Sequence, residues 1–180
     1  KGNIYTLKIF CEKNKIELKE IGLILNDHNS NKISSSEIRE NLKAGKIELA
    51  NKDLKRNFSV AGKVIKGDQR GRTIGIPTAN LGYPLNTIII PYGVYAVETI
   101  IEGNTYFGIV NFGIRPTFNK NKPIVEAYLF DFDNDIYDKN IEILFHKQIR
   151  QEKKFNDIKE LLNQINIDIA EAKKILKYGN

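Results

Sequence analysis

A glycine-rich segment over residues 62–75 contains residue types that bind phosphate groups. Asp68 and Gln69 stand where a Walker A loop requires Lys and Ser or Thr, so the glycine spacing does not make a P-loop. Glycines every four or five residues still let backbone N–H groups approach an anion closely, because no Cβ is in the way. Arg70 and Arg72 would add positive charge. The alternative is a flexible hairpin that binds no ligand.

Thr78 and Asn80 offer two side-chain oxygen atoms that suit a hard cation. They stand two residues apart in an extended segment, so their side chains project to the same side. Two neutral oxygens make a weak site alone, but the site becomes sensible when the phosphates of a nucleotide supply the remaining charge. The alternative is that both side chains only hydrogen-bond with the backbone of the turn.

Glu126 is the only ionisable carboxyl group in the run Ile124–Phe130, which is otherwise apolar or aromatic. Burying such a charge without a use would be costly. In phosphoryl transfer, a carboxylate placed in this way could act as the base that orients a hydroxyl nucleophile. The alternative is an edge residue that faces water.

Short β-type runs separated by turn residues follow residue 57. Their connections are too short for helical crossovers, so neighbouring strands should be antiparallel and should form a closed or nearly closed barrel. The predicted fold is mainly β, a six-stranded antiparallel Greek-key barrel with C-terminal helices. The predicted strands are Phe58–Ile65, Thr87–Ile90, Gly93–Ile101, Asn104–Phe112, Ile124–Phe132 and Asn140–Phe145.

Helical periodicity returns after Lys154. One apolar stripe consists of Phe155, Ile158, Leu161, Leu162 and Ile165. Asp168 and Glu171 are then predicted to cap a last helix that runs through Leu176.

The N-terminal residues have a mixed pattern. Ile4–Phe10 and Ile16–Ile24 fit two strands, and a polar loop follows at residues 27–31. Ser34 and Glu37 have the form of a capping box, so a helix should begin there and end at Gly45.

These elements divide the chain into two predicted domains, residues 1–56 and residues 57–180. Two strands and a helix or two are too few for a self-sufficient core of about 56 residues. The first part is therefore interpreted as a remnant of a larger domain. A chain that begins with Lys1 and contains no methionine is also interpreted as a fragment.

Composition excludes several classes of protein. The formal net charge of +6 is spread over single lysines, without the arginine clusters or interleaved aromatic residues of a nucleic-acid groove. No apolar run is long enough to span a membrane, and the first residues build no signal peptide, so we expect a soluble, cytoplasmic protein. Cys11 is the only cysteine, which excludes an intrachain disulfide. His28 and His146 are isolated, so a structural metal is not expected.

The acidic segment from Asp131 imitates a calcium-binding loop. Asp133, Asp135 and Glu142 have suitable spacing, but Ile136 occupies the position that requires glycine. Both flanks have the pattern of strands rather than helices. We therefore predict a polar hairpin turn.

Several motifs together resemble those of the riboflavin kinases, over about residues 58–178. In chain order they are Gly67-x-x-x-Gly71-Arg72-x-x-Gly75-x-Pro77-Thr78-Ala79-Asn80-Leu81, Gly93-Val94-Tyr95-Ala96-Val97, Gly113-Ile114-Arg115-Pro116-Thr117-Phe118, Glu126-Ala127-Tyr128-Leu129-Phe130-Asp131-Phe132 and Arg150-x-Glu152-x-x-Phe155. The resemblance implies a six-stranded barrel that transfers the γ-phosphoryl group of ATP to the 5′-hydroxyl of riboflavin, giving FMN.

The resemblance also implies roles for single residues. Thr78 and Asn80 match the ligands of the Mg²⁺–ATP complex, and Glu126 matches the carboxylate proposed to take the proton of the hydroxyl. The remaining matches are Gly67, Gly71 and Arg72 in the loop that covers the phosphates, and Arg150 and Phe155 in the flap that folds over the flavin.

The segment Ile33–Arg39 resembles the last signature of FMN adenylyltransferase domains, which are Rossmann-like and precede the kinase in bacterial bifunctional enzymes. The other signature of that domain is absent, so this chain is expected to make FMN but no FAD. Three alternatives stay open: a non-catalytic barrel that binds flavin or nucleotide, a basic barrel that binds nucleic acid, and a kinase for another small alcohol.

Overall fold

The computed structural model describes residues 3–20, 22, 32–67, 70–84, 86–115 and 122–179, without the side chains at positions 70, 115 and 122. It divides into two compact units, Lys1–Ile33 and Ser34–Asn180. Among the described residues, no helix has the length and apolar character needed to cross a membrane.

The first unit contains helix α1, Ile4–Lys13, so the strand predicted over Ile4–Phe10 is wrong. Asn3 starts the helix, because its Oδ1 accepts a hydrogen bond from the backbone N–H of Thr6 at 2.9 Å. Residues 16–20 do not form the predicted second strand. The other residues of that prediction, apart from Gly22, and the polar loop at 27–31 lie outside the described residues.

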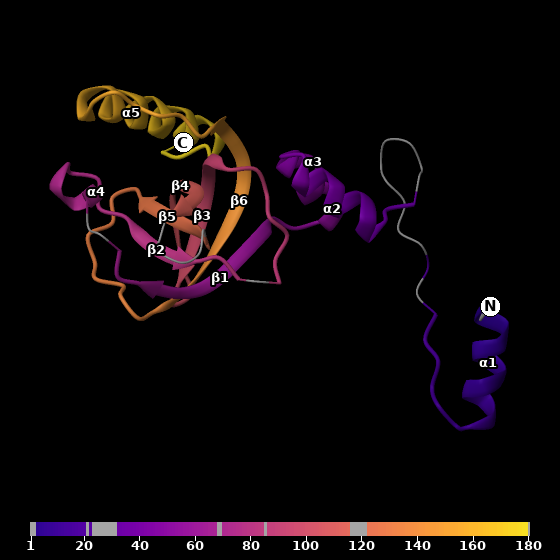
Figure 1. Cartoon of the computed structure of the whole chain (residues 1–180). Helices are drawn as coiled ribbons and strands as arrows, with labels where there is room; N and C mark the ends of the chain where they lie inside the picture. Colours follow the sequence, from indigo (N-terminus) through magenta and orange to yellow (C-terminus); the bar gives the residue numbers. More distant parts are fainter. Residues whose placement is uncertain are drawn as a thin grey trace. The chain divides into compact units, whose positions relative to one another are not determined.

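The second unit is built on a closed barrel of antiparallel strands (Figure 1). The strands are β1 Phe58–Ile65, β2 Ala79–Gly82, β3 Gly93–Ile101, β4 Asn104–Arg115, β5 Lys122–Leu129 and β6 Asn140–Gln151. Their order is β1-β2-β5-β4-β3-β6, so β6 returns beside β3 after a three-strand meander, as in a Greek key. The predicted six-stranded antiparallel barrel is confirmed.

One predicted strand is misplaced. The second strand is β2, whereas Thr87–Ile90 has no strand structure. This apolar run is instead an irregular segment packed on the barrel: Ile90 is buried, and the hydroxyl of Tyr83 donates to the carbonyl of Ile88 at 2.5 Å. Burial of apolar side chains, rather than strand pairing, explains its composition.

Two helices precede the barrel and share its core. They are α2, Ser35–Lys43, and α3, Ile47–Leu54. Ser34 Oγ accepts the N–H of Glu37 at 3.1 Å, which confirms the predicted cap, and Gly45 separates the helices with φ +75°. The buried side chains that the helices contribute to this core are Leu42, Ile47 and Ala50.

Helix α5, Ile158–Ile175, lies against β3, β4 and β6 (Figure 1). Ala172 and Leu176 pack there against Val94 and Phe130 in a second apolar cluster. The prediction that Asp168 caps a helix is wrong. Asp157 caps α5 and Asp168 lies in its middle, so the predicted C-terminal helices are one continuous helix.

Candidate active site

A row of polar side chains crosses three neighbouring strands. Glu126 on β5 pairs in register with Asn80 on β2 and with Asn111 on β4. Residues paired in this way present their side chains on the same face of the sheet. Leu81, which follows Asn80 on β2, and Val125, which precedes Glu126 on β5, belong to the barrel core. Because adjacent residues of a strand point to opposite faces, the polar row faces outward.

The outward face of this row lines a cleft of about 770 Å³, called here the flap cleft. Thr78, Asn80 and Glu126 all line it, together with residues 152–155 and part of α5. Its apolar walls include Val94, Ile109, Ile124, Leu161 and Ile165. The three candidates for metal binding and base catalysis therefore meet in one cavity.

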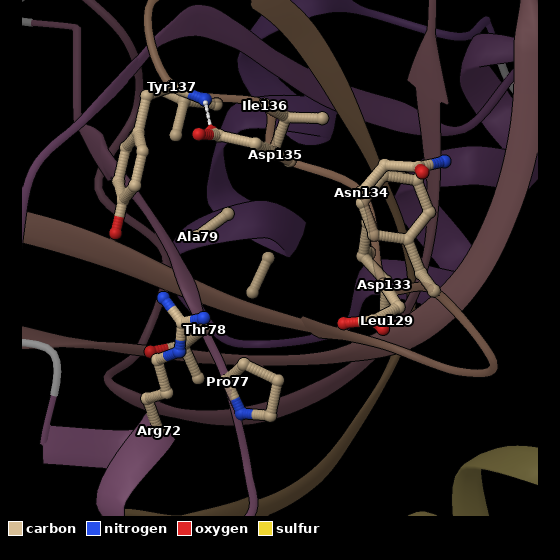
Figure 2. A pocket seen from close by; sticks show the side chains of 13 residues that line it. Arg72, Pro77, Thr78, Ala79, Leu129, Asp133, Asn134, Asp135, Ile136 and Tyr137 are labelled. Carbon is tan, nitrogen blue, oxygen red and sulfur yellow. Dashed lines mark hydrogen bonds between the residues drawn. The ribbon is translucent and has the colours of Figure 1, made fainter.

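A second cavity of about 450 Å³, called here the loop pocket, lies between β2 and the loop after β5 (Figure 2). Arg72 and Thr78 line one side, and residues 133–137 line another. The backbone N–H of Tyr137 donates to Asp135 Oδ1 at 2.9 Å, which shapes this loop. Because Thr78 lines both cavities, they adjoin at this residue.

Within the described part of the chain, the side-chain oxygen of Asn80 has the burial and the free lone pairs expected of a cation ligand. The side chain is 5% exposed, and its Oδ1 is buried without a hydrogen-bond partner among the described residues. The amide Nδ2 lies 3.5 Å from the carbonyl of Thr78, so bonding with the turn backbone involves only the nitrogen. A buried unpaired acceptor costs about 1–3 kcal/mol. The orphaned oxygen therefore fits a site for a divalent cation such as Mg²⁺.

The glycine-rich loop folds tightly over this site. Its helical turn α4, Arg70–Thr73, is followed by a hydrogen bond from Ile76 N to Gly71 O at 2.8 Å. A Cβ on Gly71 would collide with the carbonyl of Ile76, and one on Gly67 would collide with the carboxamide of Asn80. Gly71 is thus needed for the close approach of the helical turn to the segment before β2, and a side chain at position 67 would displace the carboxamide of Asn80.

A β-bulge brings Arg150 to the flap cleft. Val94 pairs with Arg150, but Tyr95 pairs with Gln148, so Ile149 is the extra residue in β6. The bulge places both Ile149 and Arg150 on the side of the barrel that α5 covers. Residues 150–157, called here the flap, then lead from the end of β6 to α5.

The structure also shows site residues that the sequence analysis missed. Asn111 and Asp168 line the flap cleft. Asn111 is a polar residue in an apolar strand, the signal that identified Glu126, whereas nothing in the sequence links Asp168 to Arg150.

The acidic segment that imitates a calcium loop lies between two strands, as predicted, and buries Ile136. The predicted hairpin turn is wrong, because the flanking strands β5 and β6 are not neighbours in the barrel. Its residues Asp133 and Asp135 line the loop pocket, a role that the sequence did not reveal. His146 lies away from both cavities, where its Nε2 is 3.2 Å from Glu98 Oε1.

The barrel and the residues that line its two cavities lie within the part of the chain that matches a known family of kinase domains. Residues 54–176 match the model of the family described as Flavokinase: Riboflavin kinase. The chain therefore belongs to the riboflavin kinase family.

Similar proteins carry two activities in their names. The chain is 49% identical over 144 residues to a bifunctional riboflavin kinase/FMN adenylyltransferase of Bacillus subtilis, covering 78% of this chain and 46% of the relative. It is 43% identical to a protein of the same name from Buchnera aphidicola, covering 96% and 55%. The chain thus spans about half the length of the curated relatives it matches.

A solved structure is similar to this chain over more than the barrel. A crystal structure described as a macrolide-efflux protein from Streptococcus pneumoniae is similar with a TM-score of 0.80 and 30% identity. The match covers 94% of this chain and 54% of that one.

Proposed function

We propose that this chain transfers the γ-phosphoryl group of ATP to the 5′-hydroxyl of riboflavin and so produces FMN. The observation that carries this proposal is the shared cleft: Thr78, Asn80 and Glu126 line the same cavity, and Thr78 also borders the loop pocket. A kinase needs such a junction, because its two substrates must meet at the transferred group.

The two cavities differ in the substrate that they suit. The flap cleft has apolar walls for a flat ring system and polar groups for hydroxyls, and Glu126 is among its lining residues. The loop pocket has Arg72, which can bind phosphate, beside the glycine-rich loop. We therefore place riboflavin in the flap cleft and ATP in the loop pocket, with the triphosphate directed toward Thr78.

In the proposed reaction, the 5′-oxygen of riboflavin forms a bond with the γ-phosphorus, and the bond from that phosphorus to ADP breaks. Glu126 receives the hydroxyl proton. Thr78 and Asn80 would hold Mg²⁺, which neutralises charge on the phosphates when bound. Arg72 and the backbone of the glycine-rich loop orient the triphosphate.

We also propose a division of the chain that follows the names of its relatives. Residues 57–180 form the kinase domain, and residues 1–56 derive from an FMN adenylyltransferase domain. Within the segment 1–56, helices α2 and α3 share a core with the barrel.

The test is to incubate the purified chain with riboflavin, ATP and Mg²⁺ and to separate the flavins by chromatography. We expect FMN to form, to require both ATP and the metal, and not to be followed by FAD. Flavin binding without turnover would instead support the non-catalytic alternative. Binding to single-stranded nucleic acid that ATP does not affect would support the nucleic-acid alternative.

A further inference from the structure

The ring of Phe155, which lines the flap cleft, lies close to two cationic side chains. The guanidinium carbon of Arg150 is 5.6 Å from the ring centroid, and the Nζ of Lys153 is 5.3 Å from it. Both distances are within the range of cation–π attraction. The position of the ring therefore depends on what holds the two cations.

Arg150 is held by a carboxylate of α5. Its Nε lies 3.0 Å from both oxygens of Asp168, and its Nη2 lies 2.8 Å from Oδ2. Asp168 is 1% exposed and also accepts a hydrogen bond from Gln164 Nε2 at 3.0 Å. The guanidinium is further fixed by a bond from Nη1 to the carbonyl of Gln151 at 3.0 Å. An ion pair that has a buried carboxylate and this many bonds has little freedom to rotate.

Lys153 is held by a second carboxylate of the same helix. Its Nζ lies 3.0 Å from Glu160 Oε1. The other oxygen of Glu160 accepts the backbone N–H of Asn156 at 3.1 Å and its Nδ2 at 3.2 Å. The flap is therefore tied to α5 at its start through Asp168 and near its end through Glu160.

We propose that Asp168 and Glu160 are positioning residues for riboflavin binding. Acting through Arg150 and Lys153, they hold the ring of Phe155 in the flap cleft before the flavin arrives. A group that is already ordered loses less conformational entropy on binding, so preorganisation raises affinity. This inference rests on the proposed function, because it takes riboflavin as the occupant of the cleft.

A purely structural ion pair would behave differently. If Asp168 only fastened α5 to the barrel, its loss would lower the melting temperature but leave the affinity of the folded protein for riboflavin unchanged. If it positions the flap, the affinity for riboflavin falls while the turnover of bound substrate and the KM for ATP change little. The separation of these quantities decides between the two roles.

The main variant is Asp168→Asn, measured by titration of riboflavin fluorescence and by steady-state kinetics. We expect the Kd and the KM for riboflavin to rise about tenfold or more, as for loss of a hydrogen-bonded charge, with kcat and the KM for ATP within about twofold. Glu160→Gln keeps acceptors for Asn156 but loses the charge, so a smaller rise is expected. The matched control is Glu171→Gln on the same helix, which pairs with Lys174 at 3.6 Å and should not change the Kd.

A double variant guards against misfolding. Replacing both partners, Arg150→Met with Asp168→Leu, leaves no unpaired buried charge, so the fold should be retained. We expect a melting temperature near that of the wild type and the same loss of riboflavin affinity. Wild-type affinity in this folded variant, or in Asp168→Asn, would overturn the inference. Absence of FMN formation by the wild type would refute the proposed function instead, and the fluorescence titration would still test the positioning role.

Discussion

At the scale of single residues, a substitution of Asn80 should lower activity without lowering stability. The side-chain Oδ1 is buried and unpaired among the described residues, so the folded chain gains nothing from that atom. We expect Asn80→Leu, of similar volume, to melt at or above the wild-type temperature. Its Mg²⁺-dependent FMN formation should fall about 10²-fold, as when one preorganised electrostatic group is lost. Calorimetry and rates at several Mg²⁺ concentrations test this, and a large loss of stability would contradict it.

Asn111 extends the same polar row on the other side of Glu126. Its exposed carboxamide can bond with a hydroxyl of the substrate or with the carboxylate itself. We expect Asn111→Ala to fold normally and to lose about tenfold or more in kcat/KM for riboflavin. Thr105→Ala, at an exposed position of the same strand, is the control. Equal rates for the two variants would exclude Asn111 from the site.

At the scale of elements, the glycine-rich loop depends on its close approach to the segment before β2. A methyl group at Gly71 would meet the carbonyl of Ile76, so Gly71→Ala must displace the loop. We expect the KM for ATP to rise about tenfold, because each misplaced phosphate contact loses a charge-assisted hydrogen bond. Gly82→Ala in β2 adds a Cβ in open space and serves as the control. An unchanged KM for ATP in Gly71→Ala would contradict this role of the loop.

The junction of flap and α5 should depend on pH through Glu160. The backbone N–H of Asn156 and then the bond with Lys153 lower the pKa of Glu160 from its ordinary value of 4.5. Its stabilising contribution is therefore complete above that value and is lost as the pH falls through the lowered pKa. We expect Glu160→Gln to melt below the wild type at about pH 7, and the difference between the two proteins to shrink as the pH falls below 4.5. A constant difference between the two proteins would argue against this origin.

The elements also show what the sequence could predict. Short β-type runs located β1 and β3 well. One face of β1 lies in the core, whereas β3 is buried on both faces, by the barrel core and by the cluster under α5. The same pattern failed at Ile4–Phe10, where the cap at Asn3 favours a helix, and at Thr87–Ile90, which is buried without strand pairing. The local sequence pattern indicates whether residues are buried and with what periodicity, but not which part of the fold buries a segment.

At the scale of the whole molecule, register decides which side chains meet. The sequence placed Thr78 and Asn80 together but identified Glu126 separately, and only the pairing of β2 with β5 brings Glu126 beside Asn80. The contact between Arg150 and Asp168 depends further on a bulge and on the packing of α5, neither of which has a local signal. Long-range packing therefore accounts for what the sequence analysis missed in the site.

The central claim is that the junction of the two cavities is a catalytic site in which Glu126 acts as the base. The most direct test compares initial rates of FMN formation by the wild type and by Glu126→Gln, with melting curves for both. We predict ATP- and Mg²⁺-dependent FMN formation by the wild type, and a variant that folds equally well but turns over about 10²–10⁴ times more slowly. Near-normal turnover by Glu126→Gln would contradict the account.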